Sequence, residues 1–190
     1  MNQRSAAEWT RLALLYSLLA ALAAFSRPRP AELFAGTVLV ALGEGLRCWA
    51  AGHLVKTRQL VTTGPYRYTR NPLYLGRLLI FTGLAIMARL PWLLNGAVLV
   101  AGWAVFFGYY LPRKERIEPA RLRDRHGGLY ERYADAVPAL FPRLRPYPVE
   151  AGKWRLSRWQ KNREGLTALG LLLLVLLFAL RTWGAPRGGG

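Results

Sequence analysis

Long apolar stretches separated by clusters of basic residues constrain this 190-residue chain more than any other feature. A helix that crosses a bilayer needs about 20 mainly apolar residues, and roughly 17 to 25 are acceptable. Five segments approach that length, so we expect an all-α polytopic membrane protein of one domain, residues 1–190. The expected transmembrane helices cover residues 12–25, 31–55, 73–88, 91–111 and 166–183.

The composition argues against several other classes of protein. Apolar and aromatic residues make up 53% of the chain, which is far too much for a disordered protein. The formal net charge is +17, but the basic residues lie between apolar stretches, and we find no nucleic-acid-binding motif. One cysteine and two distant histidines argue against a disulfide and against a metal site. We therefore expect neither a nucleic acid nor a metal as a partner.

The distribution of Lys and Arg predicts the orientation of the chain. With a cytoplasmic N-terminus, 20 of the 27 basic residues fall on the cytoplasmic side and five on the opposite side, as the positive-inside rule requires. We expect an integral protein of the bacterial inner membrane, with residues 56–76 and 112–145 cytoplasmic and residues 185–190 disordered. We interpret residues 12–25 as a retained helix, and a cleaved signal peptide is the alternative.

Two ionisable residues fall inside the second expected helix. Glu44 and Arg47 are three residues apart, on one turn, so their side chains can pair. Charged groups are costly at that depth, and they indicate either a polar cavity or an ion pair that holds helices together. Small residues at helical spacing predict close packing of the second and fourth helices. They are Ala41, Gly45, Cys48 and Gly52, and then Ala97, Ala101, Ala104 and Gly108.

The first large polar segment ends in a helix-start signal. Asn71 suits the N-cap position and Pro72 the first helical position, so the third helix is predicted to begin here. From that start, Arg70, Tyr74 and Arg77 follow a spacing of four and three residues. This spacing predicts a phenol and two cations near one face at the membrane surface.

The second large polar segment is rich in charge. Lys114 and Glu118 are four residues apart, and Pro119 disfavours helical geometry at the residue before it. We therefore expect a kink or a restart of the helix at Glu118. Gly127 and Gly128 are predicted to end a short helix.

These two segments together resemble a known family. Leu60 to Tyr66, followed by Arg70-Asn71-Pro72-Leu73-Tyr74, is similar to the R-[HN]-P-x-Y block of the isoprenylcysteine carboxyl methyltransferase and phospholipid methyltransferase superfamily of integral membrane enzymes. A second block falls at that superfamily's E-E-x-x-L-x-x-x-F-G-x-x-Y-x-x-Y-x-x-x-V-P spacing. It comprises Glu118, Leu122, Gly127, Tyr130, Tyr133, Val137, Pro138 and Pro142.

The resemblance implies an S-adenosylmethionine-dependent methyltransferase without a Rossmann domain, which releases S-adenosylhomocysteine and holds its cofactor at the cytoplasmic ends of the helices. It puts Lys114 at the position that faces the substrate, where the prenylcysteine enzymes tend to carry Arg. It assigns no catalytic residue. The implied cofactor-binding residues are Arg58, Gln59, Leu60, Val61, Tyr66, Arg70, Asn71, Pro72, Leu73, Tyr74 and Glu118.

The chain departs from the family pattern at three positions. Asn71 stands where the prenylcysteine branch has His, Pro119 replaces the second acid, and His126 replaces Phe. Lys114 also weakens the case for a carboxylate substrate, because Lys lacks the planar fork of Arg. Pro119 gives the best support to an alternative function, a non-catalytic lipid-binding or assembly protein on the same scaffold.

The methyl acceptor is expected to be lipophilic and to come from the membrane. A prenylcysteine-like carboxylate, an aminophospholipid, and a small hydrophobic thiol or acid all stay open, as does the oligomeric state. An ammonium lipid would first have to lose a proton, for which Glu44, Glu118 and His126 are possible acceptors. The roles of Arg47, Arg77, Asn162 and Glu164 also stay open.

Overall fold

The structure, a computed structural model, describes residues 25–26, 28–55, 60–91, 93–149, 152–162 and 164–184. These residues form helices and irregular segments without a strand, so the predicted all-α class is confirmed. Nearly all of the expected first helix, residues 12–25, lies outside the described residues, as do residues 185–190. The single domain and the orientation stay predictions.

Helices α2 (Pro30–His53) and α3 (Pro72–Ala88) form the most closely packed pair in the bundle. Glycines allow this approach: a Cβ added at Gly36 would lie 2.5 Å from the carbonyl oxygen of Gly83. A Cβ at Gly43 would lie 2.6 Å from the carbonyl oxygen of Gly76. The expected small-residue stripes are wrong at Gly45 of the second helix and at Gly108 of the fourth, because neither residue has another part of the structure within 4 Å of its Cβ position.

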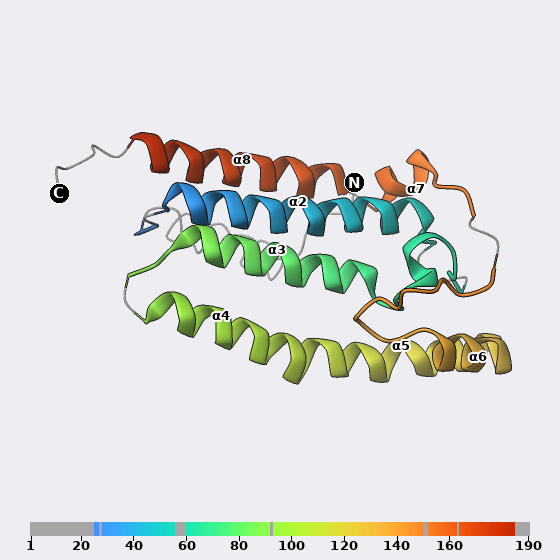
Figure 1. Cartoon of the computed structure of the whole chain (residues 1–190). Coiled ribbons are helices and arrows are strands. Elements are labelled where there is room, and N and C mark those ends of the chain that lie inside the picture. Colours follow the sequence, from blue (N-terminus) through green and yellow to red (C-terminus); the bar gives the residue numbers. More distant parts are fainter. Residues whose placement is uncertain are drawn as a thin grey trace, which may run out of the picture.

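Helices α8 (Glu164–Gly184) and α4 (Leu94–Val105) cover the two sides of this pair. Figure 1 shows the resulting order α8, α2, α3, α4 across the bundle. Phe178 of α8 and Met87 of α3 are fully buried in the core. Helix α4 packs on α3 where Phe81 contacts Gly102, and none of the residues of α4 is buried.

Three helical stretches in the described residues are long and apolar enough to cross a membrane: Pro30–His53, Leu94–His126 and Glu164–Gly184. Helix α3 is apolar but shorter, with 17 residues. These four stretches match the expected helices 31–55, 73–88, 91–111 and 166–183, except at the end of the fourth.

The fourth stretch is one helix of 33 residues, where the sequence predicts a helix that ends near residue 111. It joins α4, the π-helical turn η2 (Phe106–Tyr110) and α5 (Leu111–His126). At 1.5 Å per residue it measures about 50 Å, more than the roughly 30 Å hydrocarbon core of a bilayer. Helix α5 extends past the start of α3, as Figure 1 shows.

Two prolines explain the path of this helix. The π turn ends two residues before Pro112, which lacks an N–H and whose ring crowds the carbonyl of the preceding turn. The wider π turn accommodates that ring without ending the helix. At Pro119 α5 continues unbroken, so the expected restart at Glu118 is wrong. The helix ends at Gly127, whose φ of +51° favours glycine, as predicted.

Short elements complete the end of the bundle from which α5 projects: η1 (Gly64–Arg67), α6 (Gly128–Ala136) and α7 (Leu156–Lys161). The chain after α6 returns to the segment before α3. Arg70 N donates to Pro138 O at 2.9 Å, and Arg143 N donates to Tyr68 O at 3.0 Å. Thr69 Oγ1 donates to Leu140 O at 2.7 Å. The two polar segments of the sequence are therefore joined directly.

Candidate functional site

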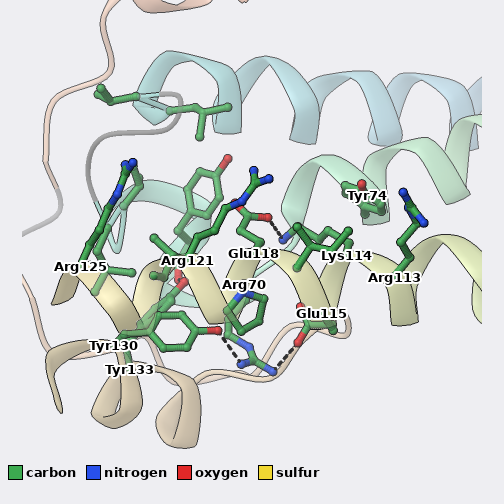
Figure 2. A pocket seen from close by; sticks show the side chains of 18 of the residues that line it. Arg70, Tyr74, Arg113, Lys114, Glu115, Glu118, Arg121, Arg125, Tyr130 and Tyr133 are labelled. Carbon is green, nitrogen blue, oxygen red and sulfur yellow. Dashed lines mark hydrogen bonds and ion pairs between the residues drawn. The ribbon is translucent and has the colours of Figure 1, made fainter. Parts of the chain in front are cut away.

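A cavity of about 1000 Å³ lies where these two segments meet. Its walls come from the residues that follow α2, the segment before α3, the first turn of α3, η2, α5 and α6. Figure 2 shows the charged and tyrosine side chains that converge on it. Seven of the residues predicted for the cofactor or the substrate line the cavity: Leu60, Val61, Tyr66, Arg70, Tyr74, Lys114 and Glu118.

The other predicted site residues do not line this cavity or are not described. Asn71 and Pro72 are buried behind its wall, and Leu73 is half-buried on α3. Arg58 and Gln59 lie outside the described residues. Helix α3 begins at Pro72 as predicted, but the Asn71 side chain does not cap it.

Asn71 instead connects the first polar segment to α5. Its Nδ2 donates to Glu115 Oε1 at 2.6 Å and to Ala139 O at 2.8 Å. Arg70 Nη2 pairs with the other carboxylate oxygen, Glu115 Oε2, at 2.9 Å. Glu115 lines the cavity and holds the two neighbouring residues of the first segment in place.

Glu115 is the site residue that the sequence reasoning missed. Three acidic residues, Glu115, Glu118 and Asp124, lie along α5, and no local spacing relates any of them to Arg70. The available signal was the adjacency of Glu115 to Lys114, which was already predicted for the site. Which carboxylate meets Arg70 depends on the rotation of α5 against α3.

Lys114 and Glu118, four residues apart on α5, form an ion pair, with Lys114 Nζ 2.8 Å from Glu118 Oε2. Lys114 Nζ also lies 5.5 Å from the centre of the Tyr74 ring. Arg77 does not line the cavity, but its guanidinium lies 5.2 Å from that centre. The Tyr74 ring is thus placed between cations of α3 and α5. Glu118 is half exposed, so its carboxylate can reach a bound molecule.

Three buried tyrosines line the cavity, Tyr66 from η1 and Tyr130 and Tyr133 from α6. Burial raises the pKa of Tyr66 and of Tyr133 well above the ordinary value, and the negative charge of Glu118 raises that of Tyr66 further. Burial also raises the pKa of Tyr130, against the effect of Arg70. Tyr133 Oη donates to Tyr66 O at 2.8 Å. These phenols therefore stay protonated at neutral pH.

Glu44 and Arg47 of α2 belong to a separate cluster between helices. Arg47 Nε pairs with Glu44 Oε2 at 3.2 Å, as predicted, and Arg47 Nη2 pairs with Glu164 Oε2 of α8 at 2.5 Å. Asn162 Nδ2 donates to Ala51 O at 2.9 Å. None of these side chains lines the cavity. Of the two interpretations, the structure favours an ion pair that holds α2 and α8 together.

These features define a polytopic helical membrane protein with a site assembled at one end of its bundle from two remote segments. The chain belongs to the phospholipid methyltransferase family, whose model matches residues 31–111. That match includes Arg70, Asn71 and Tyr74, and it confirms the resemblance of the first block. It ends before Lys114, so the contribution of α5 to the site rests on the geometry.

Two bacterial relatives are similar over most of the chain. The cobalt-zinc-cadmium resistance protein CzcN of Cupriavidus metallidurans is 32% identical over 156 residues, which are 80% of this chain and 68% of that protein. The nickel-cobalt-cadmium resistance protein NccN of Alcaligenes xylosoxydans xylosoxydans is 32% identical over 149 residues, 76% of this chain and 67% of that protein. Neither name states a reaction or a substrate. No solved structure matches the chain.

Proposed function

We propose that this protein transfers a methyl group from S-adenosylmethionine to a lipophilic acceptor that reaches the cavity from the membrane. The family assignment supports methyl-transfer chemistry. The observation that carries the proposal is the single cavity that Arg70 and Tyr74 share with Lys114 and Glu118. It lies where the apolar helices end, so a charged cofactor and a lipid can both reach it.

The residues of the cavity fit the cofactor. Its volume of about 1000 Å³ is at the upper end of the range for ligand pockets, roughly 300 to 1000 Å³, which leaves room for a nucleoside and part of an acceptor. Apolar side chains suit the adenine ring, and a carboxylate with protonated tyrosines suits a cationic sulfur and an ammonium group. The apolar lining residues include Leu54, Val55, Leu60 and Val61, and the carboxylate and the tyrosines are those of Glu118, Tyr66 and Tyr74.

The residues that do not touch the cavity have a positioning role in this proposal. Asn71 holds the Glu115 carboxylate, and Glu115 holds Arg70 at the cavity wall. Pro72 and Leu73 form the first turn of α3, which presents Tyr74. These contacts would keep the binding residues aligned before any ligand arrives.

When bound, S-adenosylmethionine supplies an electrophilic methyl group on a positively charged sulfur. The main task of the protein is then alignment, which can contribute on the order of 7 to 11 kcal/mol to a reaction of this kind. Glu118 and the ring of Tyr74 would bind positive charge, and Arg121 would bind the amino-acid carboxylate at the end of the cavity farther from η2. The tyrosines would exclude water from the reacting groups.

Calorimetric titration of the purified protein with S-adenosylhomocysteine tests cofactor binding. We expect binding to weaken by about tenfold or more in Glu118→Gln and in Tyr74→Ala, because each removes a charged or aromatic contact. Arg132→Gln, an exposed residue of α6 that does not line the cavity, is the control. No heat and no thermal shift at millimolar ligand would instead favour a non-catalytic lipid-binding protein. Labelled cofactor incubated with a total lipid extract then identifies the class of acceptor.

A further inference from the structure

The charges around the cavity are unequal. Five cations line it, namely Arg70, Arg113, Lys114, Arg121 and Arg125, against two carboxylates. Both carboxylates are already paired, Glu115 with Arg70 and Glu118 with Lys114. Among the described residues, Arg113 and Arg121 have no carboxylate partner. Among its described lining residues, the cavity therefore has more cations than carboxylates, which favours anionic groups.

The two arginines without a carboxylate partner stand far apart along α5. They are eight residues apart, which is about 12 Å along the helix axis. In Figure 2, Arg113 lies beside Tyr74 at one end of the cavity, while Arg121 and Arg125 lie toward the other end. The cavity thus offers two separate places for an anion.

Arg113 occupies the end nearer the membrane. From Leu94 to Pro112 the long helix carries no charged residue, and Arg113 is the first. The Tyr109 and Tyr110 side chains, one turn before it, are 56% and 53% exposed. Tyrosines followed by a cation are typical of the boundary between a bilayer and water. In an anionic lipid, the headgroup joins the apolar tail at this same boundary between bilayer and water.

The guanidinium of Arg113 is also oriented. Its Cζ lies 5.8 Å from the centre of the Tyr109 ring, and stacking on an aromatic ring leaves the N–H groups of an arginine free to donate. Lys114, the residue predicted to face the substrate, is instead paired with Glu118. Arg113, the residue before Lys114, therefore supplies the planar guanidinium group that a lysine lacks.

We infer that Arg113 binds the carboxylate or phosphate of an anionic amphiphile, which is the methyl acceptor if the proposed function holds. S-adenosylmethionine has one carboxylate and two cationic groups, so its binding would raise the positive charge of the cavity further. An anion at Arg113 offsets that charge while the cofactor carboxylate occupies Arg121. The tail of the amphiphile lies along α4, whose residues are not buried.

The test uses spin-labelled amphiphiles and the full-length protein in phosphatidylcholine nanodiscs. Three probes of equal chain length carry a carboxylate, a phosphate monoester or a quaternary ammonium group, and electron paramagnetic resonance measures the immobilised fraction. We expect the protein to immobilise at least one anionic probe about tenfold more tightly than the ammonium probe. Which anion is preferred distinguishes a fatty acid from a phospholipid source.

Matched variants locate the effect. Arg113→Gln is expected to abolish the preference for the anionic probe, whereas Arg116→Gln, an exposed residue of the same helix that does not line the cavity, is expected to retain it. Arg121→Gln is expected to weaken S-adenosylhomocysteine instead, with the probe preference intact. Equal immobilisation of all three probes, or equal preference in Arg113→Gln and wild type, would overturn the inference.

The two proposals fail separately in this design. If the wild-type protein binds no S-adenosylhomocysteine but the immobilisation of the anionic probe requires Arg113, the proposed function is wrong and the anion site stands. If S-adenosylhomocysteine binds and the probes show no preference, the anion site is wrong and the methyltransferase stands.

Discussion

Asn71 and Glu115 are 44 residues apart in the sequence, and the side-chain amide of the first donates to the carboxylate of the second at 2.6 Å. Through this contact the segment before α3 and the charged helix α5 form one wall of the cavity. Arg70 adds a second contact to the same carboxylate at 2.9 Å. The alignment of the site therefore depends on Glu115.

The first prediction concerns that carboxylate. Glu115→Gln removes the negative charge that Arg70 faces and leaves a half-buried guanidinium without its partner. We expect a loss of about 1 to 3 kcal/mol in the free energy of unfolding, together with weaker S-adenosylhomocysteine binding. Thermal unfolding and calorimetry measure the two effects. Glu131→Gln on the exposed face of α6 is the control, and equal stability of the two variants would contradict the prediction.

The second prediction concerns the packing of α2 on α3. Gly43→Ala places a Cβ 2.6 Å from the carbonyl oxygen of Gly76, so the helices must separate, and we expect a loss of about 1 to 3 kcal/mol. Gly45→Ala, two residues along the same helix, meets nothing within 4 Å. It should stabilise the helix slightly, because alanine favours helix over glycine. Thermal unfolding of the two variants should shift in opposite directions.

The third prediction concerns the ion pairs between α2 and α8. Glu164→Gln leaves the buried Arg47 guanidinium with Glu44 alone, and we expect a loss of about 3 kcal/mol. Because Glu164 does not line the cavity, the affinity of the folded protein for S-adenosylhomocysteine should change less than twofold. Lost affinity at unchanged stability would show instead that Glu164 takes part in binding.

The fourth prediction is a dependence of stability on high pH. The pKa values of Tyr66, Tyr130 and Tyr133 are raised in the folded protein by burial, so folding favours the protonated phenol. This contribution is complete below the pKa of an unfolded tyrosine, about 10, and is lost as the pH rises toward the folded values. Denaturation between pH 8 and 11 measures it. Tyr130→Phe should flatten the decline, and an unchanged slope in this variant would contradict the prediction.

The features that the sequence predicts well are local. The helix predicted over residues 31–55 is observed as α2, Pro30–His53. The Asn71-Pro72 pair marks the start of α3, as predicted. Gly127 marks the end of α5. Each of these depends on residues within a few positions of one another, because hydrophobic length and terminal backbone geometry are properties of a single helix.

The contacts that make the site depend on how separate helices are placed. The Lys114–Glu118 pair lies within α5 and follows from its spacing of four residues, whereas the contact between Glu115 and Asn71 depends on the rotation of α5 against the segment before α3. The amino-acid sequence likewise contains many small residues, and only the crossing of α2 and α3 selects Gly43 over Gly45. Helical periodicity specifies which residues share a face, but the partner of that face depends on packing across the whole bundle.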